Sequence, residues 1–336
     1  MLPSSNAPRQ VIRRMIAGLV IGFVVIVILA IAGDIRQVEK TVLAFDWRVY
    51  PLVLLLTLFN YALRFIKFHY YLSLIGASNI TWLQSMRLFV AGFPLAVTPG
   101  KVGEALKGAW ISQRSNVSVG RGISIVVAER ISDGLAVLLL SIVGVIAYPQ
   151  YWLAFLAVFF FLIAIVALSQ IRPVALFLLG LAGRIPIVKR FSGGLYEFYE
   201  GSFWLFRPLP TLLAVGLGTV SWLGEGLGFY LILVGLGMTP GVQLAALAVF
   251  ILSFSTVVGA VSALPGGLGA AEVSIAGMLA LLAGAEAALA STATLLIRMA
   301  TLWFGVSLGL IVWSFSLELL GLKHVRSALE RLEIGK

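Results

Sequence analysis

Two short segments, TPGKVGE at residues 98–104 and LPGGLGAAE at residues 264–272, decide how this chain folds. Each runs Pro-Gly, a further glycine and then a glutamate, and each interrupts a stretch apolar enough for a membrane helix. Proline removes a backbone donor and glycine opens dihedral space closed to other residues, so both segments predict broken helices. Unpaired backbone groups in hydrocarbon cost several kcal/mol each, so both breaks must be buried in protein or line a wet cavity.

The composition is that of an integral membrane protein. The 336 residues are 60% hydrophobic and 11% charged, whereas soluble domains are about 25% charged. The net charge is +10, and the basic residues flank apolar segments, which indicates contact with anionic lipid and argues against nucleic acid. Cysteine is absent and His69 and His324 form no evident pair, so we expect no disulfide, metal or other cofactor.

A membrane span needs about 20 apolar residues. Six runs meet this length, at residues 15–33, 50–71, 122–147, 152–169, 209–234 and 287–317. No small-residue cleavage site follows the first run, so we expect a retained helix rather than a cleaved signal. The fold class predicted is therefore an all-α polytopic membrane protein, with residues 1–336 as a single transmembrane domain.

The first break lies between two short apolar runs, at residues 83–97 and 102–111, and the second lies between the runs at residues 242–263 and 268–283. We expect each pair of runs to form a re-entrant helical hairpin, over residues 83–113 and 242–284. Residues 173–209 predict an interfacial segment with aromatic anchors, and residues 318–336 predict an amphipathic cytoplasmic tail.

The distribution of arginine and lysine orients the chain. We expect four basic clusters to be cytoplasmic: those before the first span, at Arg114 and Arg121, between residues 172 and 207, and in the tail. The expected location is the cell (inner) membrane, with both termini on the cytoplasmic side. This holds only if one hairpin enters from the cytoplasm and the other from outside. The first half, about 15–147, and the second, about 209–317, would then form an inverted-topology repeat, as in many transporters.

The two halves also share a local pattern. From Pro99 to Arg130 is 31 positions, and from Pro265 to Arg298 is 33. Each half runs from an apolar helix through the break to a glutamate, a short helix and a long span with an arginine. Free N–H groups at the new helix starts would suit an anion such as phosphate. The alternative is a turn joining two buried helices without any ligand.

Charged residues at membrane depth are costly, at about 2.5–3.5 kcal/mol each, and mark functional sites. Arg64 and Lys67 are expected to snorkel to the interface, and Arg130 and Asp133, at i and i+3, are expected to pair. Arg298 needs an anion, for which Glu225, Glu272 or a ligand phosphate are the choices. The predicted substrate-binding residues are Gly100, Glu104, Glu129, Arg130, Asp133, Glu225, Gly266, Gly267, Glu272 and Arg298.

Three G-x-x-x-G pairs, Gly18/Gly22, Gly224/Gly228 and Gly305/Gly309, predict close helix packing, with homodimer formation as the alternative.

At PGKVGE and LPGGLGAAE the chain resembles the lysylphosphatidylglycerol synthase transmembrane-region family, also called flippase-like domain proteins. The family features are a PG-x-x-G-E segment in the first half and an LPGG-x-G-x-x-E segment in the second, and the likeness covers nearly the whole chain. The resemblance implies a membrane domain that moves lipids between leaflets. In well-known members this domain is fused to a soluble aminoacyl transferase and moves lysyl-phosphatidylglycerol; we expect no such soluble domain within these residues. Other members are linked to glycolipid or hopanoid pathways.

Three functions are compatible with these features. The first is a flippase, in which Arg130, Arg298 and the helix starts hold a phosphate while the glutamates hold a cationic group or a coupling proton. The second is a membrane-embedded enzyme related to glycosyltransferases, although no Asp-x-Asp motif is present. The third is a partner of a separate lipid-modifying synthase. No Walker-type loop is found, so ATP hydrolysis is not expected, and membrane lipids, as an anionic phospholipid or glycolipid, are the expected substrate.

Overall fold

Helices make up almost the whole of the described chain. The structure is a computed structural model that describes residues 7–98, 103–147, 152–185 and 192–316. Within these ranges no strand is formed, and the protein is an all-α, multi-pass membrane protein. The elements are α1 (Ala7–Ala32), α2 (Ile35–Ala44), α3 (Tyr50–Leu74), α4 (Trp82–Ala91), η1 (Phe93–Val97), α5 (Leu106–Arg114), α6 (Val119–Ala147), α7 (Trp152–Gln170), α8 (Arg172–Ala182), α10 (Ser192–Leu205), α11 (Pro208–Gly235), α12 (Val242–Val261), η4 (Pro265–Gly267), α13 (Ala270–Ala283), α14 (Ala287–Arg298), the π-helical turn η5 (Met299–Trp303) and α15 (Phe304–Phe315).

The six predicted spans all correspond to long helices. They are α1, α3, α6, α7, α11 and the continuous run α14–η5–α15. By length and apolar composition alone, α12 and the run from η4 through α13 are also long enough to cross a bilayer. Length therefore does not separate a hairpin arm from a span, and the arrangement in space has to do so.

Two helices are sharply bent where the sequence breaks them. α1 and α2 meet at 94°, and so do α7 and α8. Asp34 lies at the first bend with a φ angle of 59°, and its carboxylate accepts a hydrogen bond of 3.1 Å from the N–H of Arg36. Pro173 opens α8 at the second bend, where its missing N–H costs nothing. The expected interfacial segment 173–209 therefore consists mainly of α8 and α10, while the tail 318–336 lies outside the described residues.

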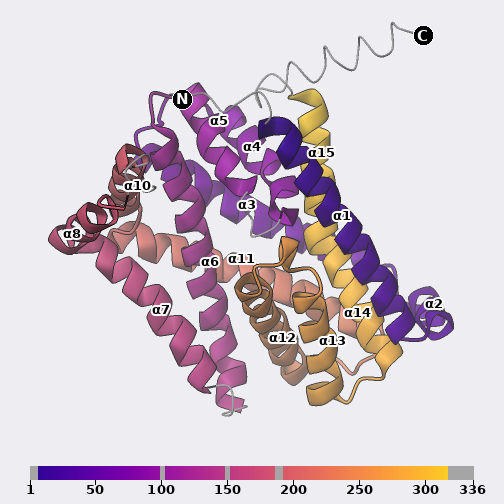
Figure 1. The fold of residues 1–336 in the computed structure, drawn as a ribbon. Coiled ribbons are helices and arrows are strands. Elements are labelled where there is room, and N and C mark those ends of the chain that lie inside the picture. The colour runs from indigo at the N-terminus through magenta and orange to yellow at the C-terminus, as the bar shows by residue number, and fades with distance from the viewer. Residues whose placement is uncertain (1–6, 99–102, 148–151, 186–191, 317–336) are drawn as a thin grey trace, which may run out of the picture.

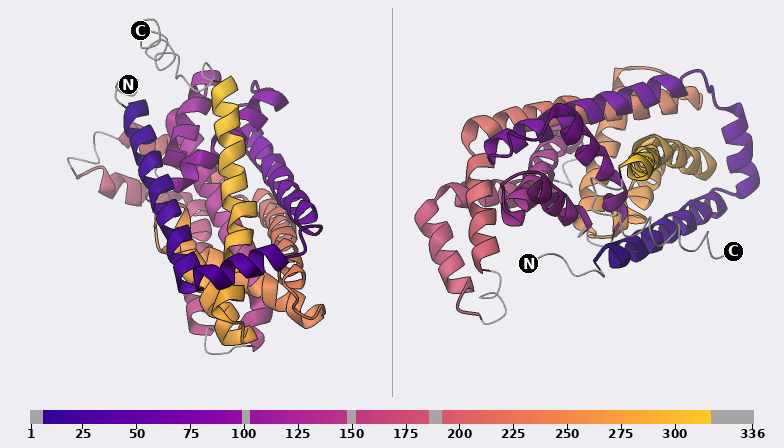
Figure 2. Two further views of the ribbon diagram at one scale, coloured as in Figure 1. Left: turned by 90° about the vertical axis from the view of Figure 1, so that its right-hand side faces the viewer. Right: turned by 90° about the horizontal axis from the view of Figure 1, so that it is seen from above.

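The two broken segments lie at opposite ends of the molecule. In Figure 1, α4 and α5 occupy the end at which α1 starts, and α12 and α13 occupy the other end. η1 and η4, at the inner ends of these segments, contact each other. Figure 2 shows the start of α1 and the end of α15 at the same end of the molecule. The chain thus doubles back twice, once from each end.

Glycines allow the helices to approach closely around this junction. A Cβ added to Gly18 would lie 1.9 Å from the carbonyl oxygen of Val97, and one added to Gly309 would lie 2.2 Å from Cδ of Pro94. These distances are shorter than any real Cβ contact, so a side chain at either position would push α1 or α15 off η1. The close-packing prediction for the G-x-x-x-G pairs is confirmed at these glycines; homodimer formation stays a prediction.

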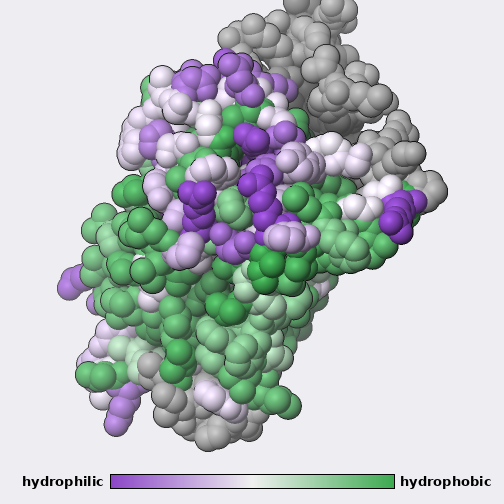
Figure 3. Space-filling view, turned by 90° about the vertical axis from the view of Figure 1, so that its left-hand side faces the viewer, coloured by the Kyte–Doolittle hydropathy of each residue, from purple (hydrophilic) through white to green (hydrophobic). Residues whose placement is uncertain are grey.

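The outer surface is apolar over much of its height. Figure 3 shows hydrophilic residues gathered in the upper part of the face that carries α8 and α10, above a broad hydrophobic lower part. Large apolar side chains are exposed along α7, including Leu153 and Phe161. Such a surface is stable only against lipid, which agrees with the membrane assignment.

Candidate functional site

The second Pro-Gly break is a turn that requires glycine. Gly266, Gly267 and Gly269 have φ angles of 61°, 68° and 89°, a region that costs residues with a Cβ about 1–2 kcal/mol. A Cβ built on Gly266 would lie 3.4 Å from Cγ1 of Val97, which shows how closely the two breaks meet. The N–H of Gly267 already donates to the carbonyl of Leu264 at 3.0 Å. Gly100, its counterpart in the first break, lies outside the described residues.

Glu272, the glutamate after this break, holds the break together. It is 3% exposed and lies three residues into α13 from its N-cap, Gly269. One carboxylate oxygen accepts a hydrogen bond of 2.7 Å from the N–H of Gly269, as the glutamate of a capping box does. The other accepts one of 2.6 Å from Nε of Arg298, whose Nη2 donates to the carbonyl of Gly266 at 3.0 Å. From the sequence, the positive N-terminal end of α13 is expected to suit a ligand anion; in the structure the Glu272 carboxylate occupies that position.

The first half contains the same pair at the same separation. Nε and Nη2 of Arg130 donate to the two carboxylate oxygens of Glu104 at 2.9 Å and 2.5 Å. Both arginines lie 26 residues after their glutamates. The glutamates are buried, whereas the side chains of Arg130 and Arg298 are 36% and 16% exposed. The two halves therefore present arginines to the cavity with their counter-ions behind them.

The predicted Arg130–Asp133 pair is wrong. Arg130 turns to Glu104 because a carboxylate on a facing helix satisfies the guanidinium at two points. Asp133 instead accepts from Nζ of Lys67 at 2.5 Å and forms an ion pair of 3.1 Å with Arg64. The hydroxyl of Ser132 accepts a further hydrogen bond of 3.1 Å from Lys67.

The snorkelling prediction for Arg64 and Lys67 is wrong for the same reason. The Lys67 side chain is 1% exposed and that of Arg64 13%. Lys67 contacts Ser132 and Asp133 on α6, and Arg64 contacts Asp133 and lies over Trp222 on α11. Asp133 supplies their counter-charge inside the protein, so neither side chain reaches for the interface.

Lys107 is a buried site residue that sequence reasoning missed. Its ammonium group lies 3.1 Å from a carboxylate oxygen of Glu129 and over the rings of Phe68 and Phe89, at 5.3 Å and 5.5 Å from their centroids. No local signal marks it, because its partner Glu129 lies 22 positions away on α6 and the two rings belong to α3 and α4.

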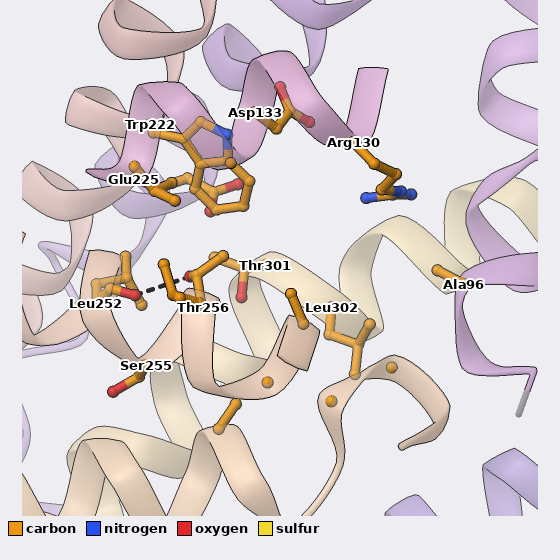
Figure 4. A pocket seen from close by; sticks show the side chains of 18 of the residues that line it. Ala96, Arg130, Asp133, Trp222, Glu225, Leu252, Ser255, Thr256, Thr301 and Leu302 are labelled. Carbon is orange, nitrogen blue, oxygen red and sulfur yellow. Dashed lines mark hydrogen bonds between the residues drawn. The ribbon is translucent and has the colours of Figure 1, made fainter. Parts of the chain in front are cut away.

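Glu225 differs from the other buried carboxylates. It is 4% exposed, and no hydrogen bond or ion pair joins it to any residue in the described ranges. Figure 4 shows its side chain and that of Arg130 projecting toward the same space, with Trp222 beside Glu225. The Arg64 guanidinium lies 5.6 Å over the Trp222 ring.

A cavity of about 830 Å³ lies where these side chains meet. Its volume is in the upper part of the range for small-molecule sites, about 300–1,000 Å³. It also reaches the outer surface of the helices, because Phe161 on α7 and Val261 on α12 line it and are 64% and 70% exposed. The charged lining residues are Arg64, Lys107, Arg130, Asp133, Glu225 and Arg298, and the polar ones include Tyr61, Ser255, Thr256 and Thr301. Among the described residues, no three His, Asp or Glu lie together as metal ligands.

Comparison with known proteins agrees with this architecture. The family described as "Lysylphosphatidylglycerol synthase TM region" matches residues 15–309, a stretch that contains both breaks and the whole cavity. The chain belongs to this family. It is also similar to a UPF0104 membrane protein of Methanothermobacter thermautotrophicus, with 25% identity over 298 residues that cover 83% of this chain and 86% of the other.

Membership of the lysylphosphatidylglycerol synthase TM family gives the protein a lipid-related membrane role. In this member, six of the ten predicted site residues line one cavity, and Glu104, Glu129 and Glu272 form ion pairs with residues that line it. The tenth, Gly100, lies outside the described ranges. Their role in binding a substrate stays a prediction.

Proposed function

We propose that this protein moves a lipid with a polar headgroup between the two leaflets. The observation that carries the proposal is the cavity at the junction of the two breaks, which combines a charged lining with an opening at the outer surface of the helices. A translocated lipid needs both features. Its headgroup must leave water for a polar environment, while its acyl chains remain in the bilayer.

The lining suits this division. The arginines and Glu225 line the cavity from α3, α6, α11 and the end of α14, and the apolar residues Val158, Phe161 and Leu162 line it from α7. A headgroup at the charged residues would leave its chains to pass beside α7 into the surrounding lipid.

Arg130 and Arg298 are suited to an anionic part of the headgroup. Each donates from Nε and Nη2 to groups of its own half, and Nη1 makes no hydrogen bond within the described residues. A guanidinium fixed on one edge keeps its other edge oriented for a phosphate, which gives a short and strong charge-assisted contact. At the second break, the start of α13 serves mainly to place Arg298, through Glu272 and the carbonyl of Gly266.

The equal glutamate–arginine separation and the opposite entry of the two broken segments support an inverted repeat. In transporters of that kind, the substrate site lies at the repeat interface and access alternates between the two faces. The proposal includes both termini on the cytoplasmic side of a cell (inner) membrane. A partner synthase also stays part of the proposal.

Reconstitution into liposomes tests this function. Fluorescent phospholipid in the inner leaflet should become accessible to an impermeant reductant in proteoliposomes and not in protein-free liposomes. Arg130→Gln and Arg298→Gln should each abolish this movement in protein that elutes as wild type on size exclusion. Arg36→Gln, which changes an exposed arginine on α2 far from the cavity lining, is the matched control and should move lipid as wild type does. Undiminished movement in both cavity variants would show that the arginines bind no substrate.

A further inference from the structure

Glu225 is the one charged lining residue of the cavity, within the described ranges, that has no direct partner. Each of the other charged lining residues contacts a group of opposite charge at 2.5–3.1 Å. A buried carboxylate without a partner is costly when ionised. Glu225 is therefore poised to gain a proton or a ligand, and the paired carboxylates are not.

The groups that face Glu225 come from each charged element packed around α11. α3 contributes Tyr61 and Arg64, α6 contributes Asp133 and Arg130, and α14 contributes Arg298. α12 also packs on α11, but its sequence contains no charged residue. Asp133 forms ion pairs with Arg64 and Lys67, so these two positive charges offset its repulsion of the Glu225 carboxylate.

Counting charges defines what the cavity can accept. The cations of the cavity and its ion pairs are Arg64, Lys67, Lys107, Arg130 and Arg298, and the carboxylates are Glu104, Glu129, Asp133, Glu225 and Glu272. With every group ionised, five positive and five negative charges cancel. With a proton on Glu225, the sum is +1, which matches the single negative charge of a phosphodiester.

We propose that the cavity binds one proton on Glu225 together with one lipid headgroup that carries a singly charged phosphodiester, so that proton and anionic lipid move together. This proposal rests on the proposed lipid movement and names its substrate class and coupling ion. The proton comes from water, forms an O–H bond on the Glu225 carboxylate, and returns to water when the lipid leaves. No other bond is made or broken.

The coupling follows from linkage. A bound phosphodiester places negative charge near Glu225 and favours its protonated form, so by reciprocity a proton on Glu225 favours lipid binding. Affinity for an anionic lipid should consequently fall as the pH rises. A zwitterionic phosphatidylcholine adds no net charge and should show no such dependence.

Isothermal titration calorimetry of the purified full chain measures this directly. Dioctanoyl phosphatidylglycerol is titrated at constant pH in two buffers of different ionisation enthalpy, which yields the number of protons taken up. We expect uptake approaching about one proton per lipid on the alkaline side of the Glu225 transition, with affinity changing by up to about tenfold per pH unit there. Glu225→Gln, which mimics the protonated acid, should bind with the high affinity of the acid limb at every pH and take up no proton. Glu225→Asp should restore the pH dependence.

The outcomes separate this inference from the proposed function. Binding of phosphatidylglycerol by wild type without proton uptake, or uptake that persists in Glu225→Gln, would overturn the coupling even if lipid movement in liposomes is intact. Inorganic phosphate is the second probe. If phosphate alone binds with the same proton uptake, the ligand is a free anion and the lipid assignment is wrong. Failure of wild type to bind phosphatidylglycerol at any pH also refutes the proposal.

Discussion

The ion pair behind the second break offers a quantitative test of how the break is held. Replacing Glu272 with glutamine keeps an oxygen that can accept from the N–H of Gly269, but it removes the charge that faces Nε of Arg298 at 2.6 Å. The Arg298 side chain is only 16% exposed, so its charge would remain buried with the Gly266 carbonyl as its main partner. Breaking such a pair costs about 3–5 kcal/mol, because one charge is left uncompensated.

The double variant separates the cost of an unpaired buried charge from the net free energy that the ion pair contributes. In Glu272→Gln/Arg298→Gln no buried charge is left alone, so much of the lost stability should return. The coupling free energy between the two positions should be about 2 kcal/mol or more. Glu286→Gln makes the same chemical change at an exposed residue and should stay within about 0.5 kcal/mol of wild type.

Unfolding by sodium dodecyl sulfate in mixed micelles, followed by circular dichroism, gives the four free energies. If Glu272→Gln loses no more stability than Glu286→Gln, or if the two single changes add in the double variant, the ion pair does not hold the break.

Two further predictions concern topology and packing. Single cysteines at Thr239 and Ala285 should react with an impermeant maleimide in intact cells, whereas those at Ser78 and Ser115 should react only after the membrane is opened; labelling of Ser78 and Ser115 from opposite sides would make the first hairpin a full crossing, and a split between Thr239 and Ala285 would do the same for the second. Gly309→Ala should destabilise the protein by about 1–3 kcal/mol through overpacking, because its Cβ would lie 2.2 Å from Cδ of Pro94. Gly277→Ala, where nothing lies within 4 Å of the added Cβ, should not destabilise it, and equal unfolding midpoints in sodium dodecyl sulfate for the two variants would contradict the close packing of α15 on η1.

The helices could be predicted from the sequence because their signals are local. Apolar run length located the six long helices, and proline with glycine located both breaks. The turn of π-helix at 299–303 was missed, since Met-Ala-Thr-Leu-Trp contains no breaker and the bulge occurs inside a continuous apolar run. The helix at 35–44 has only ten residues, three of them charged, so apolar run length does not reveal it.

Glu272 was one of three choices for Arg298, but the partners of the other charged residues could not be predicted because they depend on packing between distant helices. Asp133 lies 66 positions from Lys67, and Arg130 lies 26 from Glu104. The spacing of i and i+3 favours a pair between Arg130 and Asp133. The packing of α3 and α5 against α6 brings other partners to both residues, and this packing cannot be read from local spacing. Which charged residues are buried could nevertheless be predicted from the sequence, since ionisable residues within membrane segments are rare and face the protein interior.

The route of the lipid is tested most directly by filling the cavity. Thr256 on α12 lines it, so Thr256→Trp would place an indole within the 830 Å³. Val273 on α13 is 70% exposed on the outside of the helices, and Val273→Trp adds the same group facing lipid. Transbilayer movement of fluorescent phospholipid in proteoliposomes should fall at least about tenfold in Thr256→Trp, equivalent to about 1.4 kcal/mol in the barrier, and should be unchanged in Val273→Trp. Wild-type movement in a folded Thr256→Trp, or an equal loss in both variants, would show that lipid does not pass through this cavity.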